Sequence, residues 1–168
     1  SLLSRDGRPL RGDPDLPATA RPAADPTVLV GSAVPDPDGG LPWAMRVFGN
    51  PLGEQCIALG RLRDGTIGRL KRGEFGPLPP DTGGVCDDVA ERGVVASAER
   101  RTTPQRRTIV YGLAEGRARV TVRVAGERRS ARPGALGSFI FVFRGTRDLR
   151  GAELRTTRDG RPVVLRLG

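Results

Sequence analysis

Apolar and polar residues alternate most regularly over residues 117–124. The apolar positions are Ala118, Val120, Val122 and Val124. The positions between them are Arg117, Arg119, Thr121 and Arg123. Successive side chains of a β-strand point to opposite faces of its sheet, whereas a helix would scatter the valines around its circumference. The pattern therefore predicts a strand with one face in the core and one face in water.

Further strand patterns follow turn signals along the chain. The dipeptide Asp64-Gly65 separates residues 56–62 from residues 66–70, and Asp159-Gly160 separates residues 152–157 from residues 163–167. An Asp-Gly dipeptide between two apolar-rich runs is typical of a β-hairpin. Residues 138–143 are apolar at both alternating sets of positions, so this strand is expected to lie at the centre of the fold, with a dimer interface as the alternative.

The spacing of these signals predicts an all-β fold. About eight to ten short strands at hairpin spacing, with at most one or two short helices, favour a β-sandwich over a small barrel. One short helix is expected over residues 87–92, where Gly93 would end it. Trp43 precedes both cysteines instead of lying between them, so the expected sandwich has an Ig-like architecture without the hallmarks of Ig domains.

The first 40 residues differ from the rest of the chain. They contain seven of the fifteen prolines and carry a net charge of −2. We expect a Pro-rich, ordered N-terminal arm over residues 1–40, in extended form along a β-sandwich domain of residues 41–168. Residues 28–30 are expected to add an edge strand.

The two cysteines, Cys56 and Cys86, are 30 positions apart. We expect a structural disulfide, which forms in oxidising compartments; the alternative is two buried thiols in a cytosolic protein. Two cysteines without any histidine cannot complete a structural zinc site. No apolar run approaches the length of a membrane span, and no signal peptide is recognised at the start. The expected location is extracytoplasmic, either secreted or held to a membrane through a tether outside this chain.

Arginine dominates the charge of the protein. The net charge is +9 from 28 basic residues, and residues 97–132 alone hold ten arginines against three glutamates. The candidate contacts for an acidic protein or an envelope polyanion are Arg117, Arg119, Arg123, Arg128 and Arg129, the last two across a hairpin from the others. The alternatives are nucleic acid, for which Tyr111 is the only aromatic residue nearby, and a solvated face that reflects a high-GC genome.

Catalytic chemistry finds little support in the sequence. Histidine is absent, and no G-x-S-x-G motif is present, so no catalytic residue, metal ligand or cofactor is expected. The cluster of Asp87, Asp88 and Glu91 could hold Ca²⁺, but the start of a short helix also accounts for it. The expected function is a non-enzymatic interaction or structural domain. A nucleic-acid-binding module is the alternative, and a carbohydrate-active enzyme is the third possibility.

Several local motifs occur together between residues 41 and 145. They are a Trp strand (41–47), the run 56–62 with Asp64-Gly65, the second cysteine at Cys86, and Val110-Tyr111-Gly112. In these motifs the chain resembles uncharacterised extracytoplasmic β domains of high-GC Gram-positive, actinobacterial-type bacteria. The resemblance implies a compartment and a fold class, and it implies no catalytic residue.

Overall fold

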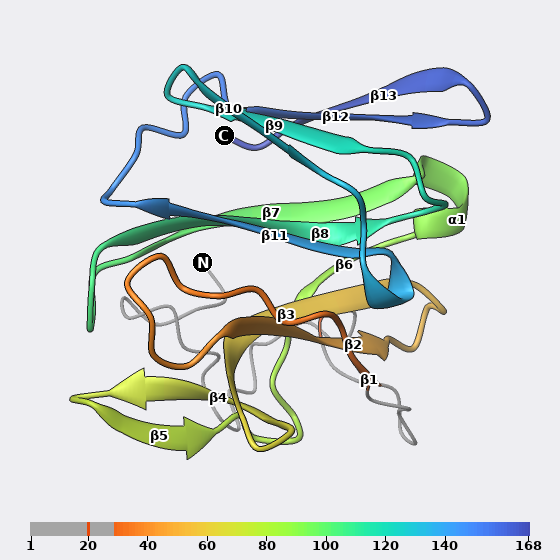
Figure 1. Cartoon of the computed structure of the whole chain (residues 1–168). Helices are drawn as coiled ribbons and strands as arrows, with labels where there is room; N and C mark the ends of the chain where they lie inside the picture. Colours follow the sequence, from red (N-terminus) through yellow and green to blue (C-terminus); the bar gives the residue numbers. More distant parts are fainter. Residues whose placement is uncertain (1–19, 21–28) are drawn as a thin grey trace.

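The structure is a computed structural model that describes residue 20 and residues 29–168. Most of the predicted N-terminal arm, residues 1–19 and 21–28, lies outside the described residues. More than half of the described residues lie in strands and very few lie in helices, which confirms the predicted all-β class. Its strands form three antiparallel sheets, which we call the lower, middle and upper sheets after their positions in Figure 1.

The bounds of the elements are as follows. The lower sheet contains β1 (Leu29–Val30), β2 (Trp43–Gly49), β3 (Gln55–Arg63), β4 (Thr66–Lys71), β5 (Glu74–Pro77) and β6 (Val85–Asp87). The middle sheet contains β7 (Val94–Arg101), β8 (Arg107–Ala114) and β11 (Ser138–Arg144). The upper sheet contains β9 (Val120–Val124), β10 (Glu127–Ala131), β12 (Glu153–Arg158) and β13 (Arg161–Arg166). The described helices are α1 (Val89–Arg92) and a 3₁₀ turn (Ala135–Gly137).

The three sheets are stacked in layers, with the middle sheet between the other two (Figure 1). The fold is therefore sandwich-like, with a third layer that a two-sheet sandwich does not have. All eight residues of β8 are buried, because its side chains face a sheet on both sides. The same position explains β11, whose sequence is apolar at both sets of alternating positions.

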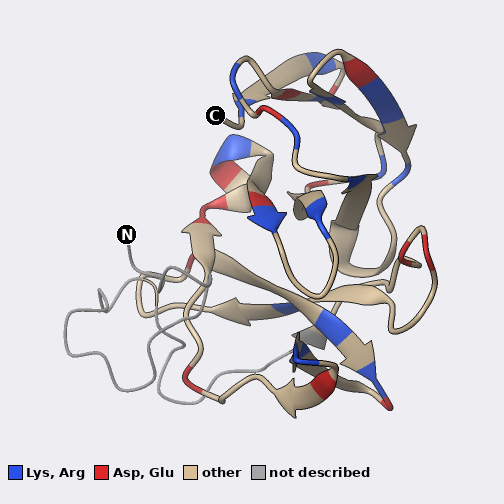
Figure 2. Cartoon of the chain, turned by 90° about the vertical axis from the view of Figure 1, so that its left-hand side faces the viewer, with Lys and Arg blue, Asp and Glu red and all other residues tan. Residues whose placement is uncertain are grey.

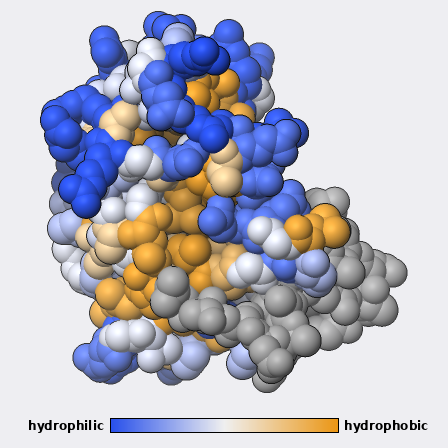
Figure 3. Space-filling view, turned by 90° about the vertical axis from the view of Figure 1, so that its right-hand side faces the viewer, coloured by the Kyte–Doolittle hydropathy of each residue, from blue (hydrophilic) through white to orange (hydrophobic). Residues whose placement is uncertain are grey.

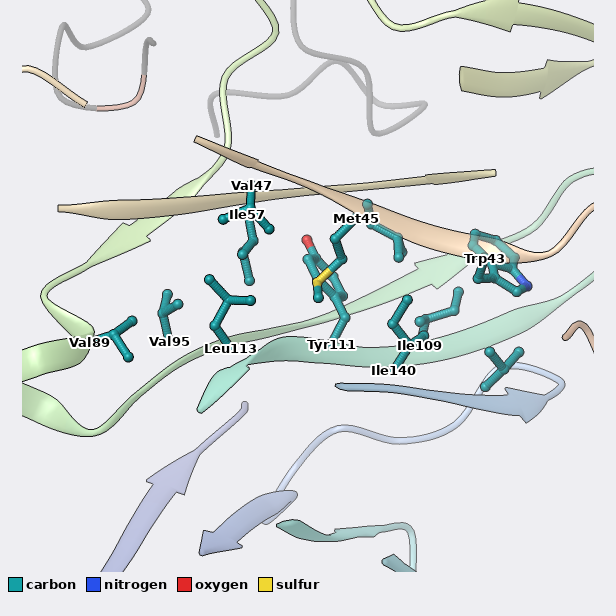
Figure 4. Packing of buried hydrophobic residues seen from close by; sticks show 12 residues of the cluster. Trp43, Met45, Val47, Ile57, Val89, Val95, Ile109, Tyr111, Leu113 and Ile140 are labelled. Atoms are coloured by element: carbon teal, nitrogen blue, oxygen red, sulfur yellow. The ribbon is translucent and has the colours of Figure 1, made fainter. Parts of the chain in front are cut away.

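One hydrophobic core lies between the lower and middle sheets. Trp43, Met45 and Val47 of β2 alternate inward, as their spacing predicts, and meet Ile109 and Tyr111 of β8 (Figure 4). The Tyr111 hydroxyl donates a hydrogen bond of 2.5 Å to Glu99, so its polar end is satisfied at the edge of this core. Burying each large apolar side chain contributes roughly 1.5–3 kcal/mol to stability.

A second core lies between the middle and upper sheets. Val120, Val122 and Val124 of β9 face the three phenylalanines of β11, which are all buried. The prediction that residues 138–143 belong to the core is therefore confirmed. The predicted strand of 117–124 begins only at Val120, because the residues after β8 must first cross from the middle sheet to the upper sheet.

The predicted turns are present. Asp64 and Gly65 both have positive φ angles, 48° and 77°, and join β3 to β4 in a tight hairpin. Helix α1 has Asp88 as its N-cap, with the side chain accepting a hydrogen bond from the Glu91 amide, and Gly93 (φ 85°) as its C-cap. Asp87 is 3.0 Å from Arg92. Two carboxylates of the cluster considered for Ca²⁺, Asp87 and Asp88, thus have partners within α1.

Residues 29–40 are tied to the rest of the fold. Strand β1 pairs with β2 at the sheet edge, where the sequence predicts an edge strand. Asp36 is buried and accepts hydrogen bonds from Trp43 Nε1 (2.9 Å) and from Arg107 at the start of β8. This segment therefore connects the lower and middle sheets. The division of the chain at residue 40 stays a prediction, because most of the arm lies outside the described residues.

The predicted disulfide is present. Cys56 in β3 lies directly opposite Cys86 in β6, and the two sulfur atoms are bonded. The bond closes a loop that contains β4 and β5, and it indicates an oxidising environment. Within the described residues, no helix is long and apolar enough to cross a membrane.

Candidate functional site

The outer face of the upper sheet carries a row of charged side chains. Because Val122 and Leu154 face the core, the residues next to them in β9 and β12 face outward. Strand pairing then aligns Arg128 of β10 with Arg123 of β9, Arg123 with Glu153 of β12, and Glu153 with Arg166 of β13. Neighbouring strands lie about 4.8 Å apart, so the row extends roughly 14 Å across the sheet.

A single carboxylate organises this row. Glu153 Oε1 lies 3.1 Å from an Arg123 nitrogen and 2.8 Å from Arg155 Nε, and Oε2 lies 2.9 Å from an Arg166 nitrogen. The Glu153 side chain is only 4% exposed, whereas the three arginine side chains are 57–70% exposed. The acid is thus covered by arginines that keep part of their surface in solvent.

The electrostatics keep Glu153 ionised. Hydrogen bonding from Arg155 lowers the pKa of Glu153, and the bond from Arg123 acts in the same direction against the opposing effect of burial. One negative charge therefore faces Arg123, Arg128, Arg155 and Arg166, which leaves this group of five with a net charge of +3. We call these five residues the arginine face.

The arginine face is hollowed at its centre. A shallow depression of about 220 Å³ is lined by Thr121, Arg123, Arg128, Glu153 and Arg155. The Thr121 and Ser130 hydroxyls lie 2.7 Å apart beside it. Arg128 is exposed and makes no ion pair with any described residue, so its charge is available to a ligand. Figure 3 shows that the end of the molecule that holds the upper sheet is predominantly hydrophilic.

The structure separates the arginines that the sequence grouped together. Arg123 and Arg128 lie on the arginine face, directly opposite each other. Arg117 and Arg119 are exposed but lie in the connection before β9, outside the strand in which they were predicted. They flank the sheet and do not belong to the aligned row.

Arg129 lies on the opposite face from Arg128. Its guanidinium sits 4.2 Å from the centre of the Phe143 ring and donates a hydrogen bond of 2.6 Å to the Val142 carbonyl. It also pairs with Glu127 at 2.7 Å. Consecutive residues of a strand point to opposite faces, so Arg128 and Arg129 could not both face outward. Arg129 therefore does not share the outer face with Arg128, and its role as a contact for a partner stays a prediction.

Three residues of the arginine face were not identified from the sequence. Glu153, Arg155 and Arg166 lie more than 20 residues after β10, in the C-terminal hairpin. Their alternation with Leu154 and Leu165 was a signal that they face outward. The pairing of β12 with β9 had no signal in the local pattern, because β10, β11 and irregular connections separate the two strands in the chain.

No family model, curated protein or solved structure matches this chain. Within the described residues, no group of three or more His, Cys, Asp or Glu side chains is arranged to hold a metal ion. The functional argument therefore depends on the geometry and charge of the molecule itself.

Proposed function

We propose that this chain is an extracytoplasmic, non-enzymatic binding domain whose arginine face holds an anionic polymer of the cell envelope. The observation that carries the proposal is the alignment of three exposed arginines with one covered carboxylate across four strands. Because Glu153 holds the guanidinium groups of Arg123 and Arg166 before any ligand arrives, less side-chain entropy is lost when these two arginines bind. The disulfide supports the oxidising compartment.

The shape of the face supports an extended polymer over a folded acidic protein. Its depression is shallow, at about 220 Å³, and the four strands present their charges in a line. Protein interfaces usually depend on buried aromatic anchors. The only large hydrophobic residue that the upper sheet exposes is Val164, which is 50% exposed. A polymer with a negative charge on each repeat needs only the line of cations.

The same face is poorly suited to single-stranded nucleic acid. Proteins that bind single strands combine a basic groove with aromatic side chains on which the bases stack. Strands β9, β10, β12 and β13 contain no aromatic residue. Nucleic acid thus remains the second candidate function, favoured only by charge.

The test compares two triple variants of equal charge. The first replaces the row (Arg123→Ser, Arg128→Ser, Arg166→Ser), and the second replaces exposed arginines elsewhere (Arg63→Ser, Arg92→Ser, Arg150→Ser). Binding of labelled heparin, poly-L-glutamate and oligo-dT is measured by fluorescence anisotropy over a series of salt concentrations. Far-UV circular dichroism verifies that both variants fold.

We expect the row variant to lose about tenfold or more in heparin affinity and to bind with a salt slope smaller by roughly two units. The control variant should lose less than about threefold, since only the general charge changes. Equal losses in the two variants would refute a localised site. Tighter binding of poly-L-glutamate would identify an acidic protein as the partner, and tighter binding of oligo-dT would identify nucleic acid.

A further inference from the structure

A second basic site lies on another part of the molecule, between the lower and middle sheets. It is a cleft of about 510 Å³, more than twice the volume of the depression on the arginine face. One wall is the end of β4 with its turn, residues 68–72, and the other is the end of β7 with the following loop, residues 100–104. Trp43, Gly60 and Arg61 complete the lining. Both walls lie on the side of the molecule that Figure 2 turns toward the viewer.

The lining is strongly cationic. Its basic residues are Arg61, Arg69, Lys71, Arg72, Arg100 and Arg101, and no carboxylate lines the cleft among the described residues. Two of these arginines pair with acids outside the cleft: Arg61 lies 3.6 Å from Asp36, and Arg101 lies 2.5 Å from Glu99. The lining stays cationic after both of these carboxylates are counted. The cations come from β3, β4 and β7, so folding brings them together.

The base of the cleft is rigid. The Arg61 guanidinium lies 4.1 Å from the centre of the Trp43 ring, and its Nε donates a hydrogen bond of 3.0 Å to the Leu41 carbonyl. Both residues are almost completely buried. A cation stacked on an aromatic ring and held at both ends loses little freedom when an anion arrives.

One donor in the lining has no partner. Arg101 Nε is buried and makes no hydrogen bond with any described residue, although the terminal nitrogen of the same side chain pairs with Glu99. A buried donor without an acceptor carries an energetic cost, which a movement of the Arg101 side chain toward an acceptor brought by a ligand would remove. The hydroxyls of Thr102 and Thr103 in the same wall add neutral donors.

We propose that this cleft binds a small molecule through a di- or triphosphate group. A volume of about 510 Å³ is within the range of roughly 300–1,000 Å³ for small-molecule sites, and it is too small for a folded partner. Guanidinium groups match phosphate oxygens in two-pronged hydrogen bonds. A di- or triphosphate carries several negative charges in a compact space, which suits a lining with six basic residues and no carboxylate among the described residues. This inference is independent of the proposed function, because the cleft and the arginine face share no residue.

The test uses inorganic tripolyphosphate, pyrophosphate and orthophosphate as probes in isothermal titration calorimetry at about 150 mM salt. The cleft variant is Arg72→Ser with Arg100→Ser, which removes one exposed cation from each wall. The matched control is Arg123→Ser with Arg128→Ser on the arginine face. We expect affinity to rise with phosphate number and the cleft variant to lose about tenfold or more for tripolyphosphate, while the control changes by less than about threefold.

The outcomes separate this proposal from the previous one. Absence of tripolyphosphate binding to the unmodified protein, or an equal loss in both double variants, would overturn the phosphate site and leave the heparin result untouched. If the expected pattern is found, two competition experiments identify the molecule that carries the phosphate group. In one, tripolyphosphate competes with a nucleoside triphosphate; in the other, it competes with vesicles that contain a diphosphate-bearing lipid. Loss of heparin binding in the control alone would confirm that the two sites act separately.

Discussion

Arg128 and Arg129 are neighbours in the chain and lie on opposite faces of β10. Arg128 faces solvent across from Arg123, whereas Arg129 lies over the ring of Phe143 and reaches the carbonyl of Val142. Two residues of identical chemistry thus have different roles, one in the charge of the surface and one in closing the core between the middle and upper sheets.

Serine substitutions should separate these roles. Arg129→Ser is expected to lower the free energy of unfolding by about 1 kcal/mol, because the cation–π contact and the hydrogen bond to Val142 are lost. Its heparin affinity should stay close to that of the unmodified protein. Arg128→Ser should change stability by less than about 0.5 kcal/mol and weaken heparin binding. Urea unfolding and anisotropy measure the two quantities, and a reversed pattern would contradict the assignment of faces.

Asp36 should be the most sensitive carboxylate of the described residues. It accepts hydrogen bonds from Trp43 and from Arg107, whose Nε and terminal nitrogen lie 3.1 Å and 2.9 Å from its two oxygens. Asp36→Asn removes the fully buried one of the two carboxylates that pair with Arg107 and leaves only the partly exposed Asp38, so we expect a loss of about 3 kcal/mol in urea unfolding. The control, Asp148→Asn, breaks the exposed pair with Arg150 and should change the free energy of unfolding far less.

At neutral pH and below, stability should depend on pH only on the acid side. Burial acts to raise the pKa of Asp36, but hydrogen bonds from Arg107, the Asp38 amide and Trp43 outweigh it and hold this pKa well below its ordinary value. The pKa of Glu153 is also lowered, chiefly by Arg155. A carboxyl with a depressed folded-state pKa stabilises the fold above its unfolded pKa, about 4, and loses that effect as the pH falls further.

We therefore expect the free energy of unfolding to be nearly constant between about pH 5 and 8, where histidine would titrate if the chain had any, and to fall below about pH 4. Urea unfolding at several pH values measures this profile. Asp36→Asn should reduce the slope on the acid side. An acid limb as steep in this variant as in the unmodified protein would show that other groups cause it.

The disulfide gives a separate prediction for stability. The unfolded, unreduced protein from an oxidising host should contain no free thiol, and reduction should release two. Replacing both Cys56 and Cys86 by alanine should lower the free energy of unfolding by roughly 3–4 kcal/mol, since a loop of 30 residues is no longer closed in the unfolded chain. Two free thiols before reduction would contradict the extracytoplasmic location and make nucleic acid the first ligand to test.

Local pattern was sufficient for much of the fold. The valines of β9 predicted which face is buried, the Asp-Gly dipeptides predicted the hairpins, and Gly93 predicted the end of α1. These features depend on neighbours within a few residues, where backbone geometry fixes the direction of each side chain. For the same reason, the outward positions of Arg123 and Arg128 follow from their own hairpin.

Only the tertiary structure decided which hairpins share a sheet and how the sheets are stacked. The row from Arg128 to Arg166 exists because β9 pairs with β12, and the cleft exists because the end of β7 faces the end of β4. Such pairings depend on how all the buried side chains of three layers fit together, and that information is not present in any short segment. The sequence by itself thus determined the strands, their faces and the cysteine pair, whereas packing among distant strands determined both basic sites.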